Sequence, residues 1–74
     1  MRAMIEESIP DIGKDFSVKK DEVVYRCKMI DQYDDQYGIP LYRVQVLGKI
    51  DGGRLIVGEP KVLEVHGGWF NDLV

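Results

Sequence analysis

The sequence contains one thiol, Cys27, and one imidazole, His66, and such a pair can act as a nucleophile with its general base. A reactive thiolate, however, needs an exposed and electropositive setting. Cys27 lies within the alternating run 22–30, on the side that carries Val23 and Tyr25, where a cysteine behaves as a small hydrophobe. His66 ends the last alternating run and is expected at the surface. We therefore expect no catalytic residue, no enzymatic activity and no cofactor.

The residue types that bind metals and phosphates are present, but not in the patterns that such sites require. Asp31, Asp34 and Asp35 place three carboxylates close together, and hard cations take clustered oxygen ligands. Their spacing does not match a calcium-binding loop, so a solvated acidic loop is expected and no metal site. The glycines do not match a phosphate-binding loop either and are expected in turns and bulges.

Aromatic residues give the one indication of recognition. Two tyrosines fall in the polar segment 32–38, and Trp69-Phe70 follows a flexible Gly-Gly pair. Aromatic rings outside a core are enriched at protein interfaces. The alternative is that Trp69 and Phe70 fold back and close the open end of the domain. The predicted protein-binding residues are Tyr33, Asp34, Asp35, Tyr37, Trp69 and Phe70.

A nucleic-acid-binding surface is the second hypothesis. It would consist of the basic residues Arg26, Lys28, Arg43 and Lys49, with Tyr33 or Tyr37 stacking on bases. The hypothesis requires all four basic side chains to share one exposed face. A net charge of -3 gives the chain no long-range attraction to phosphate backbones, so a protein partner is favoured.

These residues must be positioned by β-strands, because alternation with a period of two dominates the sequence. The firmest prediction is a hairpin in which strands 39–50 and 54–57 meet at Asp51-Gly52-Gly53, since glycine supplies the positive φ of a tight turn. Further strands are predicted at 15–18, 22–30 and 61–66. An open meander of this size leaves two edges and a bare face, which favours curling into a barrel. In strand order the chain resembles an SH3-like barrel, so the predicted fold is an all-β, five-stranded, partly open SH3-like barrel.

The 74 residues allow one domain. We divide the chain into an N-terminal arm at 1–14, a short helix or irregular; the barrel at 15–70; and a C-terminal tail at 71–74. The lone cysteine and the lack of a long apolar run predict a cytoplasmic protein that does not enter membranes. The residues that share a face under strand alternation, and hence the predicted core, are Phe16, Val23, Tyr25, Cys27, Tyr42, Val44, Val46, Ile50, Leu55, Val57, Leu63 and Val65.

The function expected from these features is that of a small stand-alone protein-binding module. Such a module would act as an accessory subunit, an adaptor or an inhibitor of a larger protein. The alternatives are the nucleic-acid-binding barrel and a structural homo-oligomer assembled through an exposed edge strand.

Overall fold

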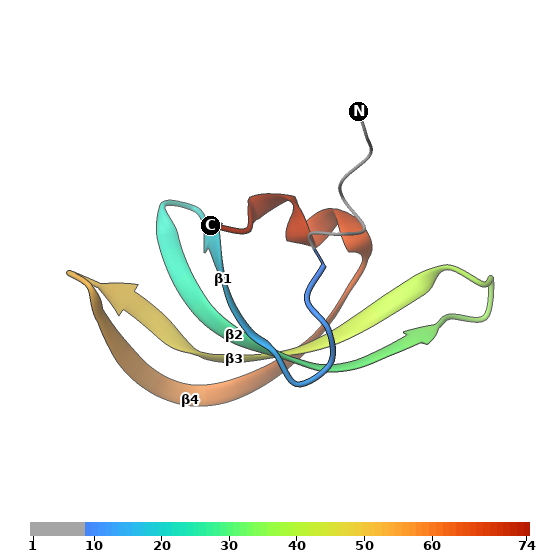
Figure 1. Ribbon diagram of the computed structural model, residues 1–74, viewed down its shortest axis with the longest axis horizontal. Helices are drawn as coiled ribbons and strands as arrows, with labels where there is room; N and C mark the ends of the chain where they lie inside the picture. The colour runs from blue at the N-terminus through green and yellow to red at the C-terminus, as the bar shows by residue number, and fades with distance from the viewer. Residues whose placement is uncertain (1–8) are drawn as a thin grey trace.

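The computed structural model describes residues 9–74, so most of the predicted N-terminal arm lies outside the described residues. Four strands follow one another as β1 (Asp15–Lys20), β2 (Val23–Asp34), β3 (Pro40–Asp51) and β4 (Arg54–Val65). They form one antiparallel sheet in the order β1-β2-β3-β4, and a 3-10 helix, η1 (Gly67–Asp72), follows β4 (Figure 1). Within residues 9–74, no helix has the length and apolar character needed to cross a membrane.

The predicted turn between β3 and β4 is confirmed. Asp51 pairs with Arg54, and the two residues between them, Gly52 and Gly53, have φ values of 60° and 79°. Positive φ at both central residues is what a type I′ turn requires, and its twist matches that of the flanking strands. The β1–β2 turn has the same character, although its residues are Asp21 and Glu22, with φ values of 52° and 67°.

The structure has four strands rather than the predicted five, because the segments 54–57 and 61–66 belong to one strand, β4. Gly58-Glu59-Pro60 does not end this strand, although the β3–β4 register is irregular there and moves from the Gly48↔Val57 pair to the Val46↔Lys61 pair. Proline is tolerated because β4 is an edge strand. The sheet is not closed, and the SH3-like barrel is not confirmed. The all-β meander is confirmed.

The predicted polar loop at 32–38 is also shorter than expected. β2 continues to Asp34, because residues 31–34 pair with residues 40–43 of β3. Only residues 35–39 connect the two strands. A bulge between Met29 and Asp31 allows this continuation, since it moves Ile30 out of the ladder.

The sheet bends into a trough, and η1 lies over its concave face (Figure 1). Phe70 of η1 is buried there, with ring centroids 5.6 Å from Phe16 and 5.2 Å from Tyr42. Such tilted and edge-on arrangements are favourable for aromatic rings. η1 therefore closes one half of the trough. The buried apolar residues are Phe16, Val18, Cys27, Met29, Val44 and Phe70.

Part of the predicted core is wrong. Leu55, Val57 and Leu63 are exposed, because they lie on the edge strand β4, of which only the last residue, Val65, packs against the core within residues 9–74. Ile50 leaves the predicted face because a bulge at Leu47 shifts the alternation of β3. After the bulge, Lys49 is opposite Tyr25, so Lys49 rather than Ile50 shares the concave face.

The two outer edges of the sheet differ. The edge of β1 is covered by the C-terminal residues, which were expected as a tail: Leu73 forms a bridge with Val18, and the Val74 N–H donates to the Ser17 carbonyl at 3.1 Å. β4 pairs with β3 alone within residues 9–74. In this described part of the chain, no other strand pairs with its outer side, and folded proteins normally protect such an edge.

Candidate binding surface along β4

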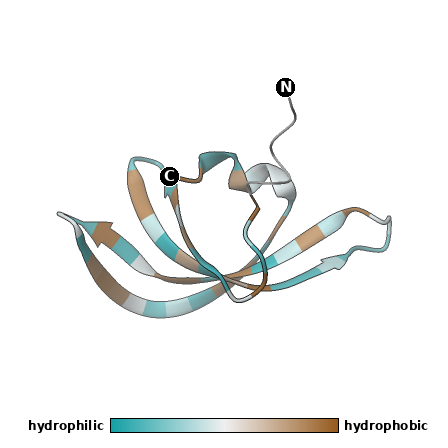
Figure 2. Cartoon of the chain, viewed as in Figure 1, coloured by the Kyte–Doolittle hydropathy of each residue, from teal (hydrophilic) through white to brown (hydrophobic). Residues whose placement is uncertain are grey.

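β4 exposes apolar side chains on both faces of the sheet. Leu63 is opposite the buried Val44 and therefore belongs to the concave face, as does Ile56, which is opposite Lys49. The intervening positions face the convex side, and Val57 and Val62 there are 70% and 53% exposed. Apolar bands are visible along β4 near the β3–β4 turn in Figure 2. A strand with apolar groups on both faces is suited to burial, yet this one is exposed.

A groove follows β4 on the part of the concave face that η1 leaves open. It consists of two hollows of about 240 Å³ and 230 Å³, which share Tyr25, Val46 and Lys61 in their lining. Each hollow exceeds the roughly 150 Å³ that admits a benzene ring in a protein interior. The groove therefore has room for two large apolar side chains. Its other lining side chains include Lys49, Ile56 and Glu59 in the first hollow, and Lys20, Leu63 and Trp69 in the second.

Trp69 is held at the end of the groove by Lys20. The Lys20 Nζ donates to the Trp69 carbonyl at 3.0 Å and to the Asp72 carboxylate at 2.6 Å. It also lies 4.8 Å from the centre of the Trp69 ring, within the range of a cation–π contact. Phe16 also packs against this ring in an edge-to-face arrangement, with centroids 6.3 Å apart. The indole is thus fixed in place while part of it faces the second hollow.

The charge of the groove is positive although the chain is acidic. Lys49 and Lys61 are exposed and form no ion pair within residues 9–74, whereas Lys20 is neutralised by Asp72. Glu59 is the one carboxylate that lines either hollow in this part of the chain. The groove therefore presents an apolar floor with two ammonium groups at its rim.

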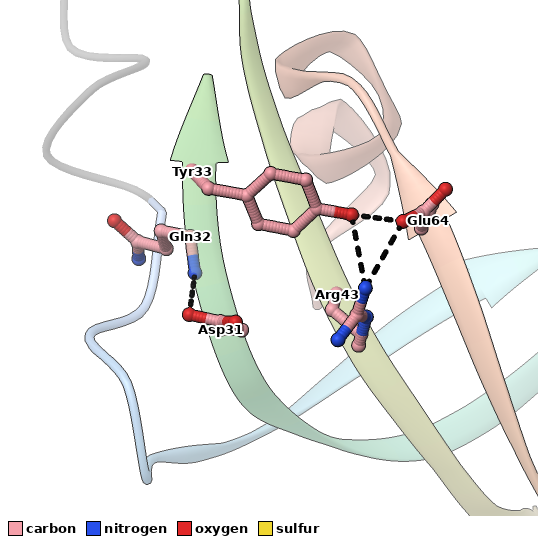
Figure 3. A network of polar contacts seen from close by, with 5 residues as sticks. All are labelled: Asp31, Gln32, Tyr33, Arg43 and Glu64. Atoms are coloured by element: carbon pink, nitrogen blue, oxygen red, sulfur yellow. Dashed lines mark hydrogen bonds and ion pairs between the residues drawn. The ribbon is translucent and has the colours of Figure 1, made fainter. Parts of the chain in front are cut away.

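A polar network occupies the convex face near the other end of β4 (Figure 3). Arg43 donates to the Glu64 carboxylate and to the Tyr33 hydroxyl, both at 3.2 Å, and Tyr33 donates to Glu64. The hydrogen bond from Tyr33, supported by that from Arg43, lowers the pKa of Glu64. The same bond to Glu64 raises the pKa of Tyr33. Three neighbouring strands are joined here, which indicates a role in fixing the sheet.

The structure does not bring the predicted protein-binding residues together. Trp69 and Phe70 contact each other, with centroids 5.3 Å apart, but Phe70 is buried in the core. Tyr33 belongs to the convex network, and Tyr37 is 78% exposed at the end of the β2–β3 hairpin, away from η1 (Figure 1). Of the four aromatic residues predicted to bind a protein, Trp69 alone lines the groove.

Of the two carboxylates predicted with these rings, Asp35 shapes the β2–β3 turn. Asp35 accepts hydrogen bonds from the backbone N–H groups of Tyr37 and Ile39, at 2.8 Å and 2.9 Å. This is an Asx-type turn, in which the side chain replaces a backbone acceptor. Asp34 is exposed at the end of β2, opposite Pro40. Within residues 9–74, no group of acidic, cysteine or histidine side chains could hold a metal ion.

The four basic residues of the nucleic-acid hypothesis do not share one face. Arg26, Lys28 and Arg43 lie on the convex side, whereas Lys49 lies on the concave side opposite Tyr25. Two of the convex cations are also next to carboxylates, Arg26 at 3.8 Å from Asp15 and Arg43 in the network with Glu64. The nucleic-acid hypothesis required one exposed face shared by all four basic side chains, and this requirement is not met.

Cys27 and His66 occupy different environments. Cys27 is fully buried, and burial raises the pKa of its thiol to about 11, although the nearby Arg26 acts in the opposite direction. At neutral pH the thiol is protonated and is a poor nucleophile. His66 is exposed and immediately precedes η1.

No protein-family model, curated protein or solved structure matches the chain. The residues along β4 could have been suspected from the sequence, since Leu55-Ile56-Val57 is an uninterrupted apolar run. Such a run is typical of a strand buried on both faces. This chain provides no such cover within residues 9–74.

Proposed function

We propose that the chain is a small protein-binding module that engages a larger protein through β4 and the groove beside it. The observation that carries the proposal is the contrast between the two sheet edges. The C-terminal residues cover β1, whereas the longer and more apolar edge, β4, has no cover within residues 9–74. An exposed apolar strand edge is a template for pairing with another chain.

The proposal keeps the function expected from the sequence and moves its surface. Trp69 remains a binding residue, while the groove and β4 replace the loop at 33–37. A partner strand on β4 would give the sheet five strands and cover the open half of the trough. The five-stranded SH3-like barrel predicted from the sequence therefore remains a hypothesis for the complex with the partner. A cytoplasmic location is part of the same proposal, as is a role as accessory subunit, adaptor or inhibitor.

A homo-oligomer built through β4 is the second candidate, because the same free edge supports it. Sedimentation of the purified chain over a range of concentrations separates the two. A monomer at all concentrations favours a different partner, whereas a dimer that Val62→Lys dissociates favours self-assembly.

Capture from extracts of the source cells tests the proposed function with matched variants. Wild type is compared with two variants that each add a lysine to the convex face of the sheet. Val62→Lys places the charge on the edge strand β4, and Gln45→Lys places it on the neighbouring strand β3. Retention of the same proteins by wild type and Gln45→Lys, and their loss with Val62→Lys, is the expected result. Equal retention by all three would show that β4 is not the binding surface.

A further inference from the structure

The free side of β4 offers a defined length of backbone to a partner. Residues 61–65 pair regularly with β3, whereas the preceding Gly58-Glu59-Pro60 segment is irregular and Pro60 has no N–H. Residues 61–65 also lie beside both hollows, since Lys61 lines each of them and Leu63 lines the second. An extended segment can pair with residues 61–65 and reach the groove at the same time.

A strand added at this edge would direct every second side chain onto the concave face. The groove has two hollows on that face, each of a size for one aromatic or large aliphatic side chain. A segment that fills both must therefore carry two large apolar residues separated by an even number of positions. Buried anchors of this kind contribute most of the affinity of a typical interface.

The rim of the groove defines the charge of the occupant. Lys49 and Lys61 form no ion pair within residues 9–74, and Glu59 is the one lining carboxylate there. Carboxylates placed beside the apolar anchors would meet these ammonium groups, whereas lysines or arginines would be repelled. Complementary charges at a rim increase the association rate and exclude wrong partners.

We propose that the occupant is an extended acidic segment of the partner protein that pairs with residues 61–65 of β4. Two of its large apolar side chains, an even number of positions apart, occupy the hollows, and its carboxylates contact Lys49 and Lys61. This proposal rests on the protein-binding function proposed above and adds the chemistry of the partner.

A second copy of the chain is a poorer occupant. In antiparallel pairing, directly opposed residues share a face of the sheet. Lys61 and Glu64 of β4 lie on opposite faces, because Lys61 is opposite Val46 and Glu64 is opposite Arg43. Self-pairing of residues 61–65 therefore never places this lysine directly across from this glutamate, and the register centred on Lys61 places two lysine side chains together.

A nucleic acid is also a poorer occupant. Single-stranded nucleic acids follow grooves with continuous positive charge and stacking aromatic rings. Here Asp72 neutralises Lys20, Glu59 lies in the first hollow, and the chain has a net charge of -3. Two lysines then remain to meet a phosphate backbone.

Selection from a random peptide library on the immobilised full chain tests the proposal without knowledge of the partner. The selected peptides should be rich in Asp and Glu and should carry two aromatic or large aliphatic residues at an even spacing. Enrichment of basic peptides, or the absence of any enriched pattern, would overturn the proposal. Equal capture of proteins by wild type and Val62→Lys would remove the protein-binding function as well. Capture that Val62→Lys abolishes, together with selected peptides that show no acidic pattern, would remove the present proposal alone.

Binding of the strongest selected peptide can be followed through Trp69, the one tryptophan of the chain, which lines the second hollow. The indole emission should shift to the blue as the ring loses water contact. Lys61→Glu should weaken binding by about tenfold or more, while the convex-face control Lys28→Glu stays within about twofold of wild type. Circular dichroism confirms that both variants are folded. Equal loss in both variants, or displacement of the peptide by oligo-deoxythymidine, would overturn the assignment.

Discussion

Replacing Gly48 with alanine should separate β4 from β3 beside the register irregularity between Val46 and Gly48. An ideal Cβ at Gly48 would lie 2.2 Å from the Ile56 carbonyl oxygen and 2.9 Å from the Val57 Cα. These are backbone atoms of β4, so no side-chain rotation can relieve the overlap. The strand itself must move by about 1 Å to restore ordinary contact distances.

The cost of this movement follows from the ladder around it. Gly48 is opposite Val57, and Lys49 is opposite Ile56, so the displaced backbone is the part that pairs with β3. Overpacking costs about 1 to 3 kcal/mol, and each lost backbone hydrogen bond about 1 kcal/mol more. We expect Gly48→Ala to lower the free energy of unfolding by about 2 to 4 kcal/mol, or the melting temperature by about 10 °C or more.

Gly58→Ala is the matched control, because Gly58 lies on β4 itself, has no positive φ, and nothing lies within 4 Å of its ideal Cβ. It should change stability by less than about 1 kcal/mol, since alanine fits that backbone without strain. Thermal denaturation followed by circular dichroism measures both variants. Melting temperatures within about 2 °C of each other would refute the reasoning.

Three further predictions concern the core and the convex network. Phe70→Ala should destabilise the fold by about 3 to 5 kcal/mol in chemical denaturation, whereas Tyr37→Ala should change it by less than about 0.5 kcal/mol; similar losses would contradict the core position of η1. The Cys27 thiol has a raised pKa, so its contribution to stability should be complete below pH 9 and decline toward pH 11, and Cys27→Ala should remove that component of the pH dependence. The Glu64 carboxyl should titrate below its ordinary range by nuclear magnetic resonance and move upward in Tyr33→Phe; an unchanged midpoint would refute the hydrogen bond.

Much of the sheet follows from local sequence patterns. The Asp51-Gly52-Gly53 turn is predictable because both glycines supply a backbone conformation that other residues adopt at a cost. The alternation around Cys27 correctly places this residue in the core, and Met29, which the predicted core did not include, is buried two positions further along the same strand. These features depend on residues close together in the chain.

The features that were missed depend on distant parts of the chain. Nothing in the run Leu55-Ile56-Val57 shows that β4 is the last strand of an open sheet, so Leu55 and Val57 were expected in the core. The bulge at Leu47 reverses the faces of the residues that follow it, which moves Lys49 to the groove and Ile50 away from it. The groove exists because η1 covers only half of the trough. This is a tertiary contact, and the alternation of apolar and polar residues within a strand does not predict it.

The position of Phe70 was among the stated alternatives, because a short chain has few residues with which to build a core. Its burial against Phe16 and Tyr42 agrees with the alternative in which Trp69-Phe70 closes the open end. Trp69 has both roles, since it packs against Phe16 and also lines the groove. A sequence pattern does not show which of these two neighbouring aromatic residues is buried and which also lines a groove.

Photo-crosslinking in the source cells tests the central claim most directly, namely that a larger protein binds along β4. A p-benzoylphenylalanine in place of Leu63 lies at the second hollow, and the same residue in place of Lys28 lies on the convex face and serves as the control. We predict an ultraviolet-dependent adduct with a larger protein from position 63 and none from position 28. An adduct from position 28 alone, equal adducts from both positions, or a product containing two copies of this chain would contradict the account.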